Sequence, residues 1–229
     1  MDFTQGDLFG LLGVYGYVAC IIVLSHLLRN RIQNPRKLVH ILTGGIVFFW
    51  WSFDSQWVMA GLAALPFIPI LLLMTPISPI KRLRDSSLGK ISSEGHEYGL
   101  VMYAISWTII AFFMFDDLFA ASVAIAAMSF GDGMGELIGR RYGKHEHISH
   151  RTIEGSLAVL LASFVAIVVI ALFYFNVIEY SGGSQPSMLL PFAFGVAGFI
   201  AILEAVTPGR IDNLVIPLVV GGFLHIMGV

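Results

Sequence analysis

The sequence predicts an all-α membrane protein, a polytopic transmembrane helical bundle of about eight spans. Hydrophobic residues make up 57% of its 229 residues and charged residues only 12%, whereas roughly a quarter of the residues in a soluble domain are charged. The apolar residues collect in eight runs separated by polar segments. Because no repeat or low-complexity segment divides the chain, we expect a single integral-membrane domain over residues 1–229.

The apolar runs give the predicted spans in order. They are 8–28, 38–53, 56–74, 98–115, 117–131, 155–177, 187–204 and 213–229. A spanning helix needs about 20 apolar residues, with a range of about 17–25, so the second, fifth and eighth runs are tilted, extended by their polar flanks or half-inserted. Trp50, Trp51 and Trp57 flank one loop as an interfacial aromatic belt does. Pro66 and Pro69 predict a kink in the third span, because each removes a helical hydrogen bond.

The cations predict the topology. All thirteen Lys and Arg residues lie in 29–37, 81–90, 140–151 and at Arg210, which are the loops after the first, third, fifth and seventh spans. The opposite side carries carboxylates and no fixed cation. The positive-inside rule makes the cationic side cytoplasmic and places both termini outside. We therefore expect a protein of the cell membrane whose active site faces the cytoplasm.

The segment SFGDGMGELIGRRYGKH at 129–145 concentrates ionisable residues at one membrane edge. Such residues cost about 2.5–3.5 kcal/mol each at the centre of a membrane helix, so a cluster of them indicates a function. Asp132, Glu136 and Arg140 recur every four residues and share one helix face. Carboxylates hold Mg²⁺ and cations hold phosphate, so the mixture favours a metal–phosphate complex.

Glycines accompany these charges. Gly131 and Gly133 flank Asp132, which predicts a carboxylate presented on bare backbone as a metal ligand. A further row at a spacing of four consists of Gly135, Gly139 and Gly143. This row lets either a phosphate or another helix approach the backbone, and the second alternative is a small-residue packing row.

The run RTIEG at 151–155 opens the sixth span on the same side. We expect Arg151 to contact phosphate, because a helix N-terminus already favours an anion. Lys144 and Glu154 extend the same rim. The structural alternative is that Thr152 is the N-cap of the helix and that Glu154 complements the helix dipole.

Two further clusters lie on the cytoplasmic side. Glu204 ends the seventh span and Asp212-Asn213 begins the eighth, although Asp212 is alternatively a cap. With Asp132 and Glu136 they supply four carboxylates, whereas Mg²⁺ is usually held by one or two together with substrate phosphates. The predicted metal ligands are therefore Asp132, Asp212, Glu204 and Glu136.

The other cluster is RKLVHILTGG at 36–45, in which Lys37, His40 and Gly44 share a helical face. His40 is either a phosphate contact or general base, or a hydrogen-bonded packing residue. The three histidines of HEHISH at 145–150 resemble a transition-metal site, but their spacing is loose and no Cys joins them, so zinc is not expected.

These motifs resemble those of the CTP-dependent lipid-alcohol kinases, which include dolichol, phytol and farnesol kinases. The matching runs are GDGMGELIGRRYGKH with RTIEGS, RKLVHILTGG, EYGLVMY at 97–103, and Glu204 with IDNLVIPL. The related phosphatidate cytidylyltransferases share the central motif, but their closing His-Gly-Gly is replaced here by TPGRIDNLVIPL. The basic residue before Thr-x-Glu-Gly, a Lys in the family, is Arg151 here, which keeps the charge and alters its geometry.

The resemblance implies a kinase that moves the γ-phosphate of CTP to a membrane-embedded isoprenoid alcohol with Mg²⁺. It implies that Arg140, Lys144 and Arg151 hold the phosphates, and that Lys37 and His40 lie near the acceptor hydroxyl. The remaining residues implied to contact the nucleotide are Gly131, Gly133, Glu154 and Asn213. The alternatives are a cytidylyltransferase and a transporter. Nucleic acid is not an expected partner, and the sequence leaves the oligomeric state and the alcohol open.

Overall fold

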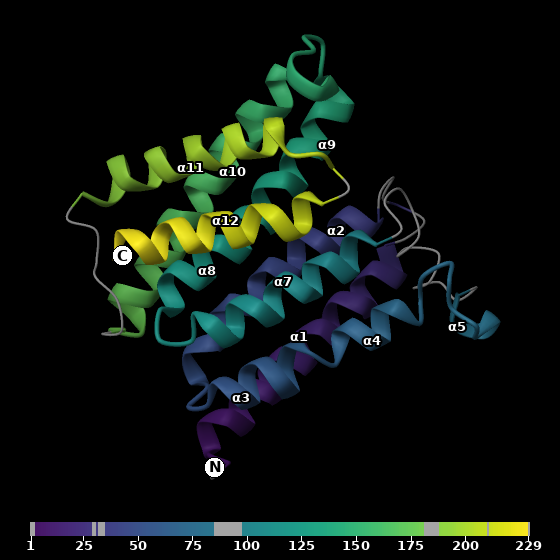
Figure 1. Cartoon of the computed structure of the whole chain (residues 1–229), viewed down its shortest axis with the longest axis vertical. Helices are drawn as coiled ribbons and strands as arrows, with labels where there is room; N and C mark the ends of the chain where they lie inside the picture. The colour runs from purple at the N-terminus through teal and green to yellow at the C-terminus, as the bar shows by residue number, and fades with distance from the viewer. Residues whose placement is uncertain are drawn as a thin grey trace. The chain divides into compact units, whose positions relative to one another are not determined.

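The elements of the protein are helical (Figure 1). The computed structural model describes residues 3–28, 31, 35–84, 98–180, 188–209 and 211–228. The α-helices are α1 (Gln5–Leu28), α2 (Pro35–Thr43), α3 (Gln56–Val58), α4 (Phe67–Leu72), α5 (Lys81–Arg84), α7 (Gly99–Phe113), α8 (Leu118–Ala126), α9 (Gly133–Tyr142), α10 (Ile153–Leu172), α11 (Leu189–Val206) and α12 (Asp212–Met227). The 3₁₀ segments are η1 (Gly44–Ser52) and η4 (Ile148–His150), and the π-helical segments are η2 (Met59–Ala64), η3 (Ala127–Asp132) and η5 (Phe173–Val177).

Eight apolar helical stretches follow the eight predicted runs. By length and composition, four of those described are able to cross a membrane, namely Gln5–Leu28, Leu118–Tyr142, Ile153–Val177 and Leu189–Val206. Four shorter ones are Lys37–Ser52, Gln56–Leu72, Gly99–Phe113 and Asp212–Met227. The predicted all-α membrane bundle is thereby confirmed. The number of crossings and the side of the termini stay predictions.

The chain folds into two compact units. The first unit comprises residues 1–113 and 209–214, and the second unit comprises residues 114–208 and 215–229. Helix α12 begins in the first unit and continues into the second. The loop expected at 75–97 is described only as far as Arg84, and Lys90 and Arg210 lie outside the described residues.

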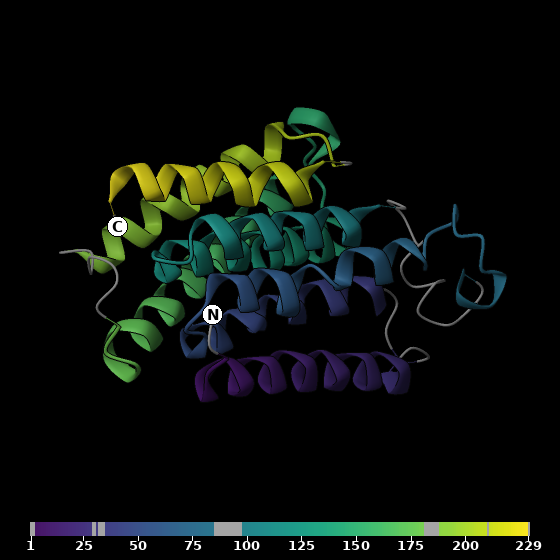
Figure 2. The same cartoon turned by 60° about the horizontal axis from the view of Figure 1, so that its bottom comes forward.

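In the first unit, α1 packs against α2, η1 and η2, and α7 packs against η2 and α4. Figure 2 shows α1 (purple) running along one side of the blue helices, with α7 (teal) on their other side. The core of this unit includes Trp50 and Met59, which are fully buried. Asp7 is buried because its carboxylate accepts the backbone N–H groups of Asp54 at 3.1 Å and of Ser55 at 3.2 Å. This carboxylate therefore has a structural role at the turn into α3.

The third span is interrupted where its prolines predicted a kink. The π-helical segment η2 ends at Ala64, and residues 65–66 form a turn before α4 begins at Phe67. Pro66 precedes α4, as expected of a residue that lacks a backbone N–H and is tolerated at a helix start.

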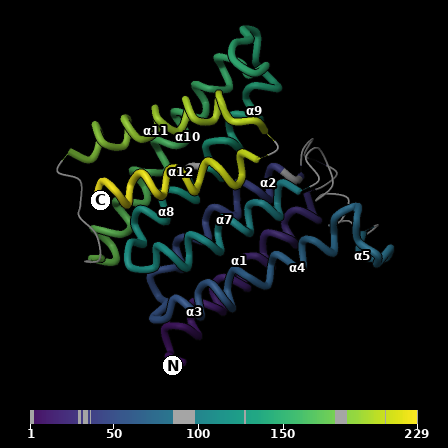
Figure 3. Tube along the Cα trace, viewed as in Figure 1, coloured from purple at the N-terminus to yellow at the C-terminus, as the bar shows by residue number. Residues whose placement is uncertain are grey.

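In the second unit, α10 is the central helix. The helices α8, α9 and α11 and the segment η3 all pack against it. Figure 3 traces this part of the chain from α8 through η3 and α9 into the loop that returns as α10. Every residue of α8 is buried. The segment from α8 to α9 is continuous helix to Tyr142, so the predicted fifth run is extended by its polar flank.

Candidate functional site

The glycine row of η3 and α9 faces α10. A methyl group at Gly135 would overlap Val159 and would lie 3.3 Å from the carbonyl oxygen of Gly155. One at Gly139 would lie 3.4 Å from the Cα of Gly155, and one at Gly131 would also meet α10. The row is therefore a packing row, as the structural alternative proposed. Contact of Gly131 with phosphate stays a prediction, as does that of Gly133, the first residue of α9.

The predicted charge ladder begins at the junction of η3 and α9. Asp132 is the last residue of the π-helical segment, and it is only 3% exposed. Such π-helical turns are frequent at functional sites. One helical turn later, Glu136 Oε1 lies 2.8 Å from Arg140 Nη2. This ion pair joins two residues of the helix face that carries Asp132, and its Arg140 side chain is 69% exposed.

The loop at 143–152 that joins α9 to α10 is a tight hairpin. The N–H of His147 donates to the carbonyl oxygen of Arg151 at 2.8 Å, and an antiparallel bridge joins the two sides of the loop. At its tip, Ser149 and His150 have φ angles of 55° and 61°. Few non-glycine residues adopt such angles, so the hydrogen bonds of the hairpin hold a fixed loop conformation here.

Glu154 binds the backbone of this loop. Its Oε2 accepts the N–H groups of Lys144 at 3.1 Å and of His145 at 3.4 Å, and its Oε1 lies 2.7 Å from Nδ1 of His145. Two residues earlier, Thr152 Oγ1 accepts the N–H of Gly155 at 3.2 Å and is the N-cap of α10. The capping alternative for Thr152 is therefore correct. Glu154 holds the backbone of Lys144 in place, while the exposed residue Lys144 projects from the loop.

Arg151 forms an ion pair with Glu204. Arg151 Nη1 lies 2.7 Å from Glu204 Oε1, and the two side chains are 23% and 4% exposed. Arg151 directly precedes the N-cap of α10, and Glu204 lies two residues before the end of α11. The pair therefore fixes a guanidinium at the N-terminus of α10, where an anion is favoured. A metal-binding role for Glu204 stays a prediction.

The remaining predicted residues belong to the first unit. His40, near the end of α2, is 3% exposed, and its ring centroid lies 5.4 Å from that of Tyr103. Asn213 donates from Nδ2 to the carbonyl oxygen of Gly99 at 2.8 Å, and its own carbonyl oxygen accepts a hydrogen bond from Ser106 at 3.0 Å. Both residues thus have packing contacts with α7. Their catalytic and nucleotide-binding roles stay predictions.

Asp212 and Lys37 complete this set. Asp212 is 7% exposed, and its Oδ1 accepts the N–H of Asn213 at 2.7 Å. This carboxylate therefore contributes to the first turn of α12. Lys37 lies one turn before His40 on α2 and is partly exposed.

Comparison with known proteins gives the family. No family model matches the chain, and no solved structure matches it. The chain is 32% identical over 218 residues to a phytol kinase of Synechocystis. The aligned residues cover 88% of this chain and 84% of that protein. The chain belongs to the phytol kinase family. It is also 28% identical to a probable phytol kinase 1 of Glycine max, over 94% of this chain and 74% of that protein, and 27% identical to a farnesol kinase of Arabidopsis thaliana, over 82% and 64%.

Membership of the phytol kinase family confirms the resemblance seen in the motifs and identifies a lipid-alcohol kinase. A kinase must neutralise the charge of the phosphates that it positions. In the second unit, Arg140, Lys144 and Arg151 are the predicted phosphate ligands. The two arginines pair with Glu136 and Glu204, and Glu154 accepts the backbone N–H of Lys144. The arrangement therefore suits a phosphotransferase of this family.

The carboxylates are the groups of this phytol kinase family member that suit Mg²⁺. Among the described residues, no group of three or more His, Cys, Asp and Glu side chains is arranged to hold a metal ion. Mg²⁺ usually needs only one or two carboxylates, because substrate phosphates and water supply the other oxygen ligands. The buried carboxylate of Asp132 at the start of α9 fits that requirement.

The structure also pairs residues that sequence analysis left unpaired. His147 Nε2 lies 2.9 Å from Ser156 Oγ, His145 contacts Glu154, and His150 Nδ1 lies 3.6 Å from Glu146. The three histidines of the loop thus have three different partners. The pairing of His147 with Ser156 spans nine residues across a hairpin, and neither helical nor strand periodicity signals such a contact.

Proposed function

We propose that this protein transfers the γ-phosphate of CTP to the hydroxyl of an isoprenoid alcohol in a Mg²⁺-dependent reaction at the membrane. Membership of the phytol kinase family supports an alcohol acceptor. The closing stretch TPGRIDNLVIPL supports a kinase rather than a cytidylyltransferase, because it lacks the His-Gly-Gly of the latter. The observation that carries the proposal is the set of three cations near the N-terminus of α10, namely Arg140, Lys144 and Arg151. We call them the anchored cations.

Each proposed phosphate ligand has a Glu partner, which binds the side chains of Arg151 and Arg140 but only the backbone of Lys144. Glu204 orients the guanidinium of Arg151, and Glu154 fixes the backbone from which Lys144 extends. Phosphoryl transfer depends mainly on positioning and on charge neutralisation. Cations fixed in advance need little reorganisation as charge develops on the phosphates. Glu136 orients Arg140 in the same way.

Asp132 and Asp212 are the proposed Mg²⁺ ligands. The ion would neutralise charge on the phosphate oxygens and orient the terminal phosphate. Glu136 and Glu204 then act through the arginines that they bind, since each already lies within 2.8 Å of a guanidinium nitrogen. We assign Lys37 and His40 to the acceptor hydroxyl, with His40 as the base.

The proposed reaction is a displacement at the γ-phosphorus. The alcohol oxygen forms a bond to the γ-phosphorus, and the bond from that phosphorus to the oxygen bridging it to the β-phosphate breaks. CDP leaves, and the hydroxyl proton passes to His40. The nucleotide arrives from the cytoplasm and the alcohol from the bilayer, so we place the site at the cytoplasmic edge of the cell membrane.

A label-transfer assay tests the proposal. Purified protein receives Mg²⁺, a panel of isoprenoid alcohols and CTP labelled on either its γ- or its α-phosphate, with γ-labelled ATP as a second donor. We expect label to move only from the γ-position of CTP to the alcohol. Transfer from the α-position to a phosphorylated lipid would make the protein a cytidylyltransferase, and equal transfer from ATP would remove the specificity for CTP.

Asp132→Asn tests the metal site in the same assay. We expect it to abolish transfer while the protein still inserts into membranes and elutes as a single species in detergent. Chelation of Mg²⁺ should abolish transfer by the wild-type protein as well. Mg²⁺-dependent transfer that persists in Asp132→Asn would remove this residue from the metal site.

A further inference from the structure

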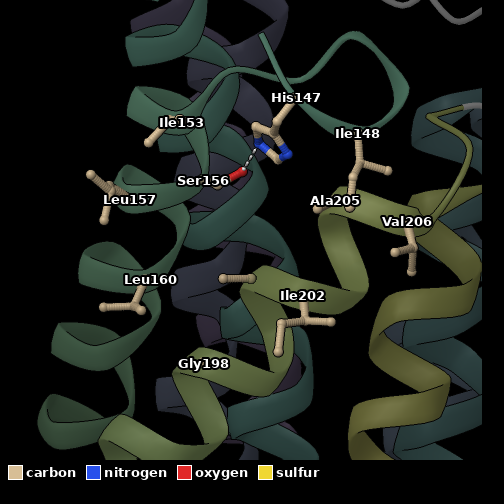
Figure 4. Close-up of a pocket in the computed structure, with 11 residues that line it drawn as sticks. His147, Ile148, Ile153, Ser156, Leu157, Leu160, Gly198, Ile202, Ala205 and Val206 are labelled. Carbon is tan, nitrogen blue, oxygen red and sulfur yellow. Dashed lines mark hydrogen bonds between the residues drawn. The ribbon is translucent and has the colours of Figure 1, made fainter. Parts of the chain in front are cut away.

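A groove in the second unit has no part in the chemistry described so far. It lies between α10 and α11 beside the loop that carries His147, and its volume is about 450 Å³ (Figure 4). Its lining includes His147, Ser156, Leu157, Leu160, Gly198 and Ile202. Small-molecule sites typically have volumes of about 300–1,000 Å³, so the groove is large enough for a ligand.

The surface of the groove is almost entirely apolar, and the two polar side chains of its lining lie together near one end, which we call the polar end. Of the side chains that line it, those of His147 and Ser156 are polar, and they lie 2.9 Å apart at the end near the start of α10. The groove follows α11 from Val206 beside this end to Gly198 at the other, a distance of eight residue-to-residue steps. A helix rises 1.5 Å per residue, so the groove is about 12 Å long.

The polar end adjoins the anchored cations. Arg151 precedes the first groove residue of α10, Ile153, by two positions, and Glu204 directly precedes the groove residue Ala205. The Arg151–Glu204 ion pair therefore lies beside the polar end in both helices. A ligand whose polar group reached His147 would have that group next to the proposed phosphate ligands.

We infer that this groove binds the isoprenoid chain of the acceptor alcohol, whose hydroxyl-bearing end leaves the groove past His147 and Ser156. These two residues line the path of the chain, and His40 remains the proposed base. This inference rests on the proposed function. A molecule with a single hydroxyl and an apolar tail matches a groove with one polar end, whereas a nucleotide would leave most of its polar groups without partners. Leu157 and Ile202 on the rim are 54% and 67% exposed, so the chain enters sideways rather than through a closed tunnel.

Gly198 offers a way to shorten the groove without disturbing the fold. A Cβ atom at Gly198 would meet no atom within 4 Å, so a leucine there extends into the groove. Gly195 lies three residues earlier on α11, is equally open at its Cβ position and does not line the groove. Gly198→Leu and Gly195→Leu are therefore a matched test and control.

The experiment measures binding before activity. Full-length protein in nanodiscs, without nucleotide, is titrated with tritiated prenyl alcohols of two and of four isoprene units. Because Gly198 is at the end far from the hydroxyl, we expect Gly198→Leu to weaken binding of the four-unit alcohol about tenfold, the loss that follows when about two methylene groups are displaced. Binding of the two-unit alcohol and both affinities of Gly195→Leu should stay as in the wild type. Gly198→Ala should not disturb the helix, because alanine has a higher helix propensity than glycine. It should weaken binding of the four-unit alcohol relative to the two-unit alcohol by a smaller factor than Gly198→Leu does.

The outcomes separate the groove from the reaction. Equal losses in Gly195→Leu and Gly198→Leu, or an unchanged length preference in both Gly198 variants, would overturn the groove as the chain site and leave it a depression filled by bilayer lipid. Length-dependent binding without phosphate transfer in the γ-labelled CTP assay would keep the groove and reject the kinase reaction. Transfer with an unaltered length profile in Gly198→Leu would reject the groove and keep the kinase.

Discussion

The ion pair between Arg151 and Glu204 gives the sharpest test of the site. Glu204→Gln keeps the shape of the side chain and removes its charge, so the guanidinium of Arg151 loses the charge of this partner. Removing one partner of a buried pair costs about 3–5 kcal/mol, whereas an exposed pair contributes about 0.2–1 kcal/mol. Glu204 is 4% exposed and Arg151 23% exposed. We therefore expect the free energy of unfolding to fall by about 3 kcal/mol, the lower end of the buried range.

A double-mutant cycle measures the interaction itself. Arg151→Met, Glu204→Gln and the double variant are unfolded with SDS in mixed micelles, and the coupling free energy should be about 2 kcal/mol or more. The control is a second cycle on Glu136 and Arg140, whose nitrogen–oxygen distance is a similar 2.8 Å but whose Arg140 side chain is 69% exposed. That pair should couple by about 0.3–0.5 kcal/mol.

Equal coupling in the two cycles would refute the reasoning, because burial would then make no difference to the strength of the pair. Activity gives a second readout. If Glu204 orients Arg151 for phosphate, both Glu204→Gln and Arg151→Ala should raise the KM for CTP. A lowered stability with an unchanged KM in both variants would confine the pair to a structural role.

Two further predictions concern stability in detergent. Gly155→Ala places a methyl group 3.1 Å from the carbonyl oxygen of Gly135 and should lower the free energy of unfolding by about 1–3 kcal/mol; an unchanged Tm, or an equal change in the open position Gly195→Ala, would contradict the packing row. Thr152→Val removes the N-cap acceptor and should lower the free energy of unfolding by about 1 kcal/mol, and a stability equal to the wild type would show that the cap contributes nothing.

The fold was predictable from the sequence because hydrophobicity marks membrane helices directly. The sixth run was predicted at 155–177, and α10 with η5 spans Ile153–Val177. The fifth apolar run ends at 131, and the helix continues to Tyr142 through the segment whose charges were predicted to share one helix face. There the polar residues ended the apolar signal, but packing of the glycine row on α10 keeps the segment helical.

The contacts between the predicted site residues could not be read from the sequence. Sequence reasoning placed Lys144, Arg151 and Glu154 on one membrane edge because positive charges sort to one side. Its assignments of Glu154 to the nucleotide and of Glu204 to a metal ion stay predictions. It did not reveal that the Glu154 carboxylate accepts backbone N–H groups of the loop, or that the Glu204 carboxylate lies 2.7 Å from Arg151. Such pairings depend on how the loop folds back on the helix, and residue spacing along the chain does not encode that.

The glycine row and the loop at 143–152 depend on each other structurally. Because Gly139 and Gly155 allow α9 and α10 to approach closely, the ten residues 143–152 suffice to connect the two helices as a hairpin. The close approach brings the first turn of α10 under the loop, so Glu154 reaches the backbone of Lys144. A bulkier residue in the row would separate the helices and so loosen the cations as well as the packing. Under the proposed function, the glycines influence phosphate binding without touching the phosphate, and a packing row and a proposed binding motif share the same stretch of sequence.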